Sequence, residues 1–265
     1  MRFVLWLLAF TGKVYGQDLL LNRGSLDVGT GGAQLAQSGI WSGFQNPALP
    51  DTEGFSLALA SAKPWIHLPL FIQAAAIQRA TSRHVWRAAL AQMGTAHYAQ
   101  QQFATAYGLK LNQNLYVGTK LEYFQMQNSE IGRNRPFLRT ALGLFYQLNQ
   151  KLAMGMAWQS HALGKSNPHF SNLNRMGLAI QWQESDKSVF LLETNQSAAT
   201  ALRWQLGWRY QVVKSLEMGF GFADRPFALS SAFKWKYRKL FLGSGFAWQI
   251  GLNSSLAIDI AYAWP

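Results

Sequence analysis

The chain ends in the alternating stretch SSLAIDIAYAWP, which runs from Ser254 to Pro265. Every second position holds a large apolar side chain: Leu256, Ile258, Ile260, Tyr262 and Trp264. The positions between them hold small or acidic side chains: Ala257, Asp259, Ala261 and Ala263. A period of two predicts a β-strand whose faces meet different surroundings. The aromatic pair that ends the apolar face is typical of the interfacial girdle of a membrane β-barrel.

The same alternation recurs through most of the preceding two hundred residues. Between residues 201 and 211, one face holds Leu202, Trp204, Leu206, Trp208 and Tyr210, whereas the other holds Arg203, Gln205, Gly207, Arg209 and Gln211. Segments of roughly ten residues have the length that a tilted membrane strand requires. We expect fourteen of them, beginning near residues 54, 67, 83, 101, 113, 136, 151, 173, 187, 199, 215, 226, 239 and 253. The sequence therefore predicts an all-β fold, a closed antiparallel transmembrane β-barrel of about 14 strands over residues 52–265.

Composition agrees with this fold. Charged residues make up only 14% of the chain and hydrophobic residues 49%, with a mean hydropathy of -0.05. A soluble domain usually has about 25% charged residues. The chain contains no run of roughly eighteen apolar residues, which excludes a helical membrane span. Sparse charge with neutral hydropathy favours strands between lipid and water over the alternative, a large soluble β-sandwich.

Residues 1–16 have the pattern of a secretory signal peptide. Arg2 provides the positive start, Phe3 to Phe10 the apolar core, and Val14-Tyr15-Gly16 a cleavage site before Gln17. The predicted location is the outer membrane of a Gram-negative bacterium. The chain contains no cysteine, so a disulfide framework, a thiolate metal site and a lipidation site are excluded.

The net charge is +12, from 24 Lys plus Arg against 12 Asp plus Glu. Basic residues are spread one or two to a strand rather than clustered, which argues against nucleic acid as a partner. Anionic lipid headgroups of the outer membrane are the expected partner for this charge. Six basic residues have the parity of the inward face: Lys120, Arg139, Arg203, Arg209, Lys234 and Lys236.

Residues 17–51 form a Gly-rich segment without a sustained period. A barrel of about fourteen strands has an interior wider than its own side chains can fill. We therefore expect this segment to plug the lumen. The alternative is a disordered periplasmic tail, which suits the glycine content. Against that alternative stand six apolar residues: Leu26, Val28, Leu35, Ile40, Trp41 and Phe44.

Signals for catalysis are poor. The five histidines have no metal-like spacing, and no serine lies in a strand-turn-helix elbow. The acidic residues Glu193, Glu217 and Asp259 are expected to pair with basic residues of the lumen rather than to form a catalytic pair. The sequence predicts a protein that is not an enzyme and that uses no cofactor and no metal.

Several motifs resemble a known family. Gly31-Gly32-Ala33, the step through Trp41, Ser42 and Phe44, and the turn at Asn46-Pro47-Ala48 are similar to the amino-terminal motif of PorV/PorQ-like barrels. These are FadL-related outer-membrane proteins of the Bacteroidota. The ending Ile258-Asp259-Ile260-Ala261-Tyr262 is similar as well, and so is Arg225-Pro226-Phe227 at a strand start. One departure is Leu49-Pro50, where the family turn usually continues with Gly-Leu.

The resemblance implies a plugged barrel of fourteen strands. Its plug or hatch residues would be Gly31, Gly32, Trp41, Phe44, Asn46 and Pro47. Its carboxyl-terminal sorting strand, the signal read during outer-membrane assembly, would use Ile258, Ile260, Tyr262 and Trp264.

The resemblance favours a non-enzymatic accessory or docking subunit of an outer-membrane machine such as the type IX secretion system. Its partners would then be another barrel or secretion-system proteins. The main alternative is a FadL-like channel for hydrophobic small molecules, with the amino-terminal segment as a hatch. A third is a diffusion porin that prefers anions, because the inward face is basic. An apolar pocket beside the plug would favour transport of a hydrophobic ligand, whereas an open polar bore would favour the porin.

Overall fold

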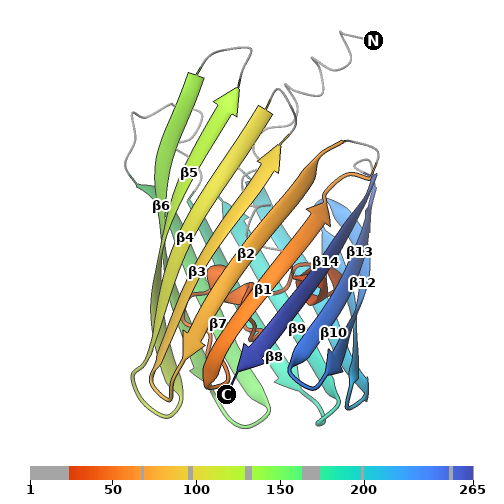
Figure 1. Cartoon of the computed structure of the whole chain (residues 1–265). Helices are drawn as coiled ribbons and strands as arrows, with labels where there is room; N and C mark the ends of the chain where they lie inside the picture. Colours follow the sequence, from red (N-terminus) through yellow and green to blue (C-terminus); the bar gives the residue numbers. More distant parts are fainter. Residues whose placement is uncertain are drawn as a thin grey trace.

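A computed structural model describes residues 24–66, 69–94, 98–128, 133–162, 174–197, 200–250 and 253–264. Fourteen antiparallel strands close into a barrel in which each strand pairs with its neighbours in sequence (Figure 1). The strands are β1 Gly54–Lys63, β2 Phe71–Ala80, β3 His84–Gly94, β4 Tyr98–Lys110, β5 Leu115–Asn128, β6 Arg133–Gln147, β7 Leu152–Ala162, β8 Arg175–Gln183, β9 Ser188–Ser197, β10 Thr200–Val213, β11 Leu216–Asp224, β12 Phe227–Tyr237, β13 Leu240–Gln249 and β14 Asn253–Trp264. The predicted fold class is confirmed.

The barrel closes where the alternating carboxyl-terminal strand meets the first strand. Phe55 of β1 is opposite Trp264 of β14, with ring centroids 5.3 Å apart, and Leu57 is opposite Tyr262. An open edge in hydrocarbon would cost several kcal/mol for each backbone group left without a partner. This pairing removes the edges.

The strand starts follow the sequence pattern, with three that differ by three residues or more. The second strand was expected near residue 67 and begins at Phe71, because Pro64 and Pro69 lie in the preceding connection and proline cannot donate to a ladder. The fourth strand was expected near residue 101 and begins at Tyr98, and the sixth was expected near residue 136 and begins at Arg133. Residues 163–173, between β7 and β8, lie outside the described residues.

The two longest connections between strands, residues 64–70 and 163–174, both follow odd-numbered strands and therefore lie at the same end of the barrel. Even-numbered strands are followed by short turns at residues 81–83, 111–114, 148–151, 184–187, 214–215 and 238–239. These turns lie at the lower end in Figure 1, where β14 ends. Short turns mark the periplasmic side of outer-membrane barrels. We therefore call this the periplasmic end and the opposite one the outer end.

The two faces of the wall differ in side-chain type. In β10 the large apolar side chains from Leu202 to Tyr210 point outward and are 37–48% exposed, whereas Gln205 and Gly207 between them are buried. Outward aromatic rings stack from strand to strand, as Trp182 does on Phe190. An apolar outer face and a polar, small inner face are what a strand between lipid and lumen requires.

Besides the strands, the described residues contain two short helices, α2 Ser25–Gly29 and the 3-10 helix η2 Ser42–Phe44. Both belong to the red and orange segment inside the barrel in Figure 1. In the ranges that the structure describes, no helix is long and apolar enough to cross a membrane.

The orientation of β10 gives a first prediction. Leu206 lies near the middle of β10 and points outward. Leu206→Arg should destabilise the folded barrel in liposomes by about 2–4 kcal/mol, the cost of arginine on the lipid face at mid-bilayer. Leu206→Phe keeps the apolar character and should fold like the wild type. Urea unfolding of both variants measures the difference, and equal stability would contradict the assignment.

Candidate functional site

The most distinctive part of the lumen is the segment 24–51, here called the plug. It lies inside the barrel, with α2 packed against β11, β12, β13 and β14 (Figure 1). Its apolar residues are almost completely buried: Leu26, Val28, Leu35, Trp41, Phe44 and Leu49. Residues 24–51 are therefore not a free tail. The proposed signal peptide and residues 17–23 lie outside the described residues.

Two acidic side chains of the wall hold backbone N–H groups of the plug. Glu193 of β9 accepts hydrogen bonds from the amides of Gln34 at 2.6 Å and Leu35 at 2.8 Å. Asp259 of β14 accepts one from the amide of Ser25 at 2.5 Å. These carboxylates therefore fix the first half of the plug.

Neutral wall residues hold the turn that follows α2. Gln205 donates to the carbonyl of Gly31 at 2.7 Å, and the hydroxyl of Ser230 accepts from the amide of Gly31 at 2.9 Å. Gly31 and Gly32 have φ angles of 69° and 84°. Side chains other than glycine rarely adopt such angles. The two glycines thus allow the plug to reverse direction against the wall.

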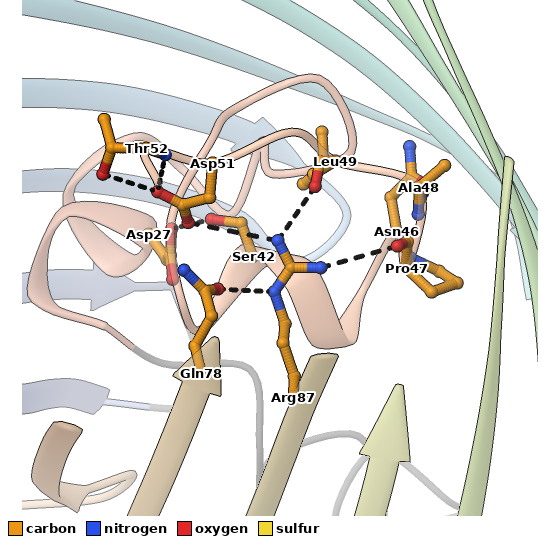
Figure 2. A network of polar contacts seen from close by, with 10 residues as sticks. All are labelled: Asp27, Ser42, Asn46, Pro47, Ala48, Leu49, Asp51, Thr52, Gln78 and Arg87. Atoms are coloured by element: carbon orange, nitrogen blue, oxygen red, sulfur yellow. Dashed lines mark hydrogen bonds and ion pairs between the residues drawn. The ribbon is translucent and has the colours of Figure 1, made fainter. Parts of the chain in front are cut away.

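Two basic side chains hold backbone carbonyls in the second half of the plug. Lys120 of β5 donates to the carbonyl of Phe44. Arg87 of β3 donates to the carbonyl of Leu49 at 2.9 Å and to the side chain of Gln78 at 2.7 Å (Figure 2). Its guanidinium also lies 4.0 Å from the carboxylate of Asp51. Arg87 therefore anchors the end of the plug to the barrel.

The Asn46-Pro47-Ala48 turn has a structural role in this arrangement. The side-chain amide of Asn46 donates to the carbonyl of Leu35 at 2.7 Å and to that of Leu144 in β6 at 3.1 Å. Its side-chain oxygen accepts from the amide of Ala48 at 3.1 Å. One side chain thus joins two parts of the plug to the wall.

Glycines of the inward face make room for the plug backbone. At many of them an added Cβ would lie within 3 Å of a plug atom: Gly108, Gly118, Gly143, Gly155, Gly177, Gly207, Gly221, Gly243 and Gly245. At Gly118, for example, a Cβ would be 2.5 Å from the carbonyl oxygen of Pro47. The wall is therefore shaped to the plug on almost every side.

Asp27 organises the plug from within. Its carboxylate accepts hydrogen bonds from Ser42 at 2.9 Å, from Gln37 at 3.0 Å and from the amide of Gly24 at 3.2 Å. Burial raises the pKa of Asp27 to about 7, and the charge of Asp259 also raises it, whereas the bond from Ser42 lowers it. Asp27 thus ties residues 37–42 back to α2.

The six basic residues expected on the lumen face do not form one group. Lys120 and Arg139 both pair with Glu122, and Arg209 pairs with Glu217. Lys234 and Lys236 lie over the ring of Phe241 at 4.8 and 5.6 Å from its centroid. Arg203 is half-buried elsewhere on β10. Within the described ranges there is no group of three or more His, Cys, Asp or Glu that could hold a metal.

The other expected residues fall at three places. Trp41 and Phe44 are buried in the apolar core. Pro47 lies against the wall glycines, as described. The sorting-strand residues Ile258, Ile260 and Trp264 point outward, and Tyr262 has the same parity. Their role in assembly stays a prediction.

Sequence reasoning missed three wall residues that hold the plug, Arg87, Gln205 and Ser230. It also missed Glu122, which pairs with the plug anchor Lys120. Each is a polar or charged residue with inward parity in the middle of a strand. That shared position is a usable signal. Arg87 is the clearest case, because it interrupts a run of inward apolar residues that includes Val85 and Ala89.

The outer half of the lumen has an apolar side and a polar side. Inward apolar residues on β1, β2, β3, β5 and β6 form the apolar arc: Ala62, Ile72, Ala91, Met93, Phe124 and Phe137. Between β3 and β5, strand β4 interrupts the arc with the buried polar side chains of Gln100 and Gln102. Phe124 stacks on Phe137 with centroids 4.7 Å apart. Ile40, Trp41 and Phe44 of the plug pack in the same cluster. Inward positions of β7 to β10 are polar instead: Gln159, Arg175, Asn195 and Arg203.

No protein-family model and no curated protein sequence matches the chain. Solved structures do match. The chain is similar to the monoaromatic hydrocarbon channel CymD, with 14% identity over 92% of this chain and 98% of that one and a TM-score of 0.69. It is also similar to the toluene transporter TodX of Pseudomonas putida, with 10% identity, coverage of 91% and 98%, and a TM-score of 0.68.

A third similar structure is the outer membrane protein Omp33 of Acinetobacter baumannii, with 11% identity, coverage of 80% and 98%, and a TM-score of 0.53. Identities this low establish the fold alone. The chain therefore has the barrel fold of outer-membrane proteins, channels among them. The likenesses give no support to the PorV/PorQ-like group or to an origin in the Bacteroidota.

The inward glycines that contact the plug give a second prediction. Gly118→Ala places a methyl group against the Pro47 carbonyl and should destabilise the plugged barrel by about 1–3 kcal/mol, the usual cost of overpacking. Gly219→Ala is the matched control, because the nearest atom to its Cβ would be Cδ2 of Leu26 at 3.4 Å, with Thr30 and Gly29 farther away, at ordinary van der Waals distances. Denaturant unfolding in detergent compares the two. A Gly118 variant as stable as the Gly219 variant would show that the plug does not press on this wall.

The carboxylate anchor gives a third prediction. Glu193→Ala removes the acceptor of two buried amides and should cost about 1–3 kcal/mol. Hydrogen exchange at Gln34 and Leu35 should accelerate. Glu217→Ala is the control, because Glu217 pairs with Arg209 and not with the plug. Unchanged exchange in the Glu193 variant would refute the anchor.

Proposed function

We propose that this protein is an outer-membrane channel for small hydrophobic or amphipathic molecules, with the plug as its closure. The apolar arc carries the proposal. Ile72, Met93 and the Phe124–Phe137 stack pack against the plug in the closed state. Each apolar group of this size is unfavourable by roughly 1.5–3 kcal/mol when it is exposed to water. Displacement of the plug would therefore leave a surface that favours an apolar solute over water. Ligand sites are typically apolar with a few placed polar groups.

The arrangement of the plug supports the same proposal. Trp41 and Phe44 pack in the apolar cluster, so the plug occupies the place that a hydrophobic solute would take. If the plug moved away, the apolar arc would face the lumen opposite the polar side chains of β7 to β10. The apolar arc would contact the apolar part of a solute, and the polar side chains would contact any polar group that it carries. The fold likeness to CymD and TodX agrees with this solute class.

The two other functions considered have weaker support. A porin that prefers anions needs unpaired cations along its bore, whereas Lys120, Arg139 and Arg209 are paired with acids. A docking subunit of a secretion machine is favoured by the sequence resemblance and by none of the structural likenesses. It stays a prediction without support from the fold.

A fourth prediction tests the channel. In a Gram-negative host without hydrocarbon channels, the wild type should increase uptake of radiolabelled toluene. Phe137→Gln should reduce that uptake about tenfold, because it replaces an apolar contact worth about 1.4 kcal/mol or more with a polar one. Phe137→Leu keeps the arc apolar and should retain most of the uptake.

Two outcomes would contradict the proposal. Uptake equal to that of the empty vector, with the barrel present in the outer membrane, would exclude the channel for this solute class. Faster entry of arabinose than of toluene would identify a porin instead.

A further inference from the structure

The outer wall carries a hollow of about 460 Å³ over β1 to β5 near the periplasmic end. Most of its lining residues have outward parity: Phe55, Ile77, Arg79, Trp86, Ala88, Thr105, Tyr107, Thr119 and Leu121. The other four lining residues, Gln78, Arg87, Ala106 and Lys120, have inward parity. This hollow, here called the outer groove, therefore lies mainly on the lipid side of the wall.

Strand register explains the shape of the outer groove. Arg79 is opposite Phe55 on one side and Trp86 on the other, and Trp86 is opposite Tyr107 with ring centroids 4.3 Å apart. The next outward row contains Ala88 beside Thr105. Small side chains thus form a floor next to a wall of aromatic rings. Trp86 is 57% exposed, so that wall stands well clear of the floor.

Arg79 is the chemically informative residue of the outer groove. It points outward and is exposed, one residue before the end of β2. No salt bridge to Arg79 is found in the described part of the chain. Arginine is tolerated on a lipid face near the interface, where its stem lies along apolar surface and its head reaches the headgroups. Its planar guanidinium binds phosphate with two hydrogen bonds.

The turns at the periplasmic end are basic as a group, with Arg83 and Lys110 nearest the outer groove, and the turn 184–187 also holds the acids Glu184 and Asp186. Every short periplasmic turn, or the residue next to it, contributes a cation: Arg83, Lys110, Lys151, Lys187, Lys214, Arg238 and Lys239. Cations at a membrane surface attract anionic lipid headgroups, and this attraction falls off within about a Debye length. The periplasmic end therefore favours a negatively charged neighbour.

We propose that the outer groove is a binding site for an anionic phospholipid of the periplasmic leaflet. The phosphate lies on the guanidinium of Arg79, and an acyl chain lies over Ala88 and Thr105 beside Trp86. The cation at the membrane-surface end of the groove complements the phosphate of a phospholipid. The floor of small side chains and the aromatic rim complement its acyl chain. This inference does not depend on the channel function.

Native mass spectrometry of the full-length barrel tests the proposal. The protein in a mild nonionic detergent is mixed with phosphatidylglycerol, and the lipid-bound fraction is measured. Arg79→Gln should weaken retention about fivefold, the effect of removing one cation close to an anionic headgroup. Ala88→Phe fills the floor and should reduce retention to a similar extent while Arg79 is intact.

Two controls make the result specific. Arg225→Gln removes an exposed arginine at the outer end, whose side chain is 62% exposed. Ala75→Phe adds the same ring on the outward face of β2 outside the groove lining. Both should retain the lipid like the wild type. Equal retention by all variants, equal loss in the controls, or a groove occupied by a second copy of the chain would each overturn the proposal.

Discussion

The structure depends on satisfying the backbone of a plug that lies in the lumen of a closed barrel. A buried N–H or C=O without a partner costs about 1–3 kcal/mol, so the wall must provide acceptors and donors at matching places. Acidic side chains of the wall provide acceptors, and basic side chains provide donors. Glu193 and Asp259 accept from N–H groups in the first half of the plug, whereas Lys120 and Arg87 donate to carbonyls in the second half. The many basic residues of this chain thus have a structural use inside the barrel as well as at its ends.

Close approach is the second requirement, and it explains the small inward residues. Charged anchors can reach the plug backbone only if the wall lies near it, and inward glycines such as Gly118 and Gly221 allow that distance. The same glycines would be a weakness in an ordinary strand, because glycine loses more conformational freedom on folding than other residues. Barrel closure compensates, since every strand is paired on both sides.

The alternation of side chains was enough to predict the barrel, the strand number and the pairing of the last strand with the first. It succeeded because lipid and lumen impose a period of two on every strand. The anchors were harder to predict. Glu193 and Asp259 were recognised as lumen acids but were assigned to ion pairs with basic residues, whereas they bind plug amides. Which backbone group an inward side chain meets depends on the path of an irregular segment, and no periodicity encodes that path. Arg87 was missed for the same reason.

The distribution of anchors bears on how a plugged channel could open. The wall carboxylates hold the plug near Ser25 and Leu35, and the wall cations hold it near Phe44 and Leu49. The part between them contains Ile40 and Trp41, which pack in the apolar cluster, and it is tied through Gln37 and Ser42 to Asp27 within the plug. Under the channel proposal, the part that must leave the apolar arc is this middle part, and it can do so while the charged anchors at both ends stay intact. The cost of opening then lies mainly in apolar contacts and in the hydrogen bonds to Asp27. An apolar solute that enters the arc would replace those apolar contacts, which couples the binding of the solute to the movement of the plug.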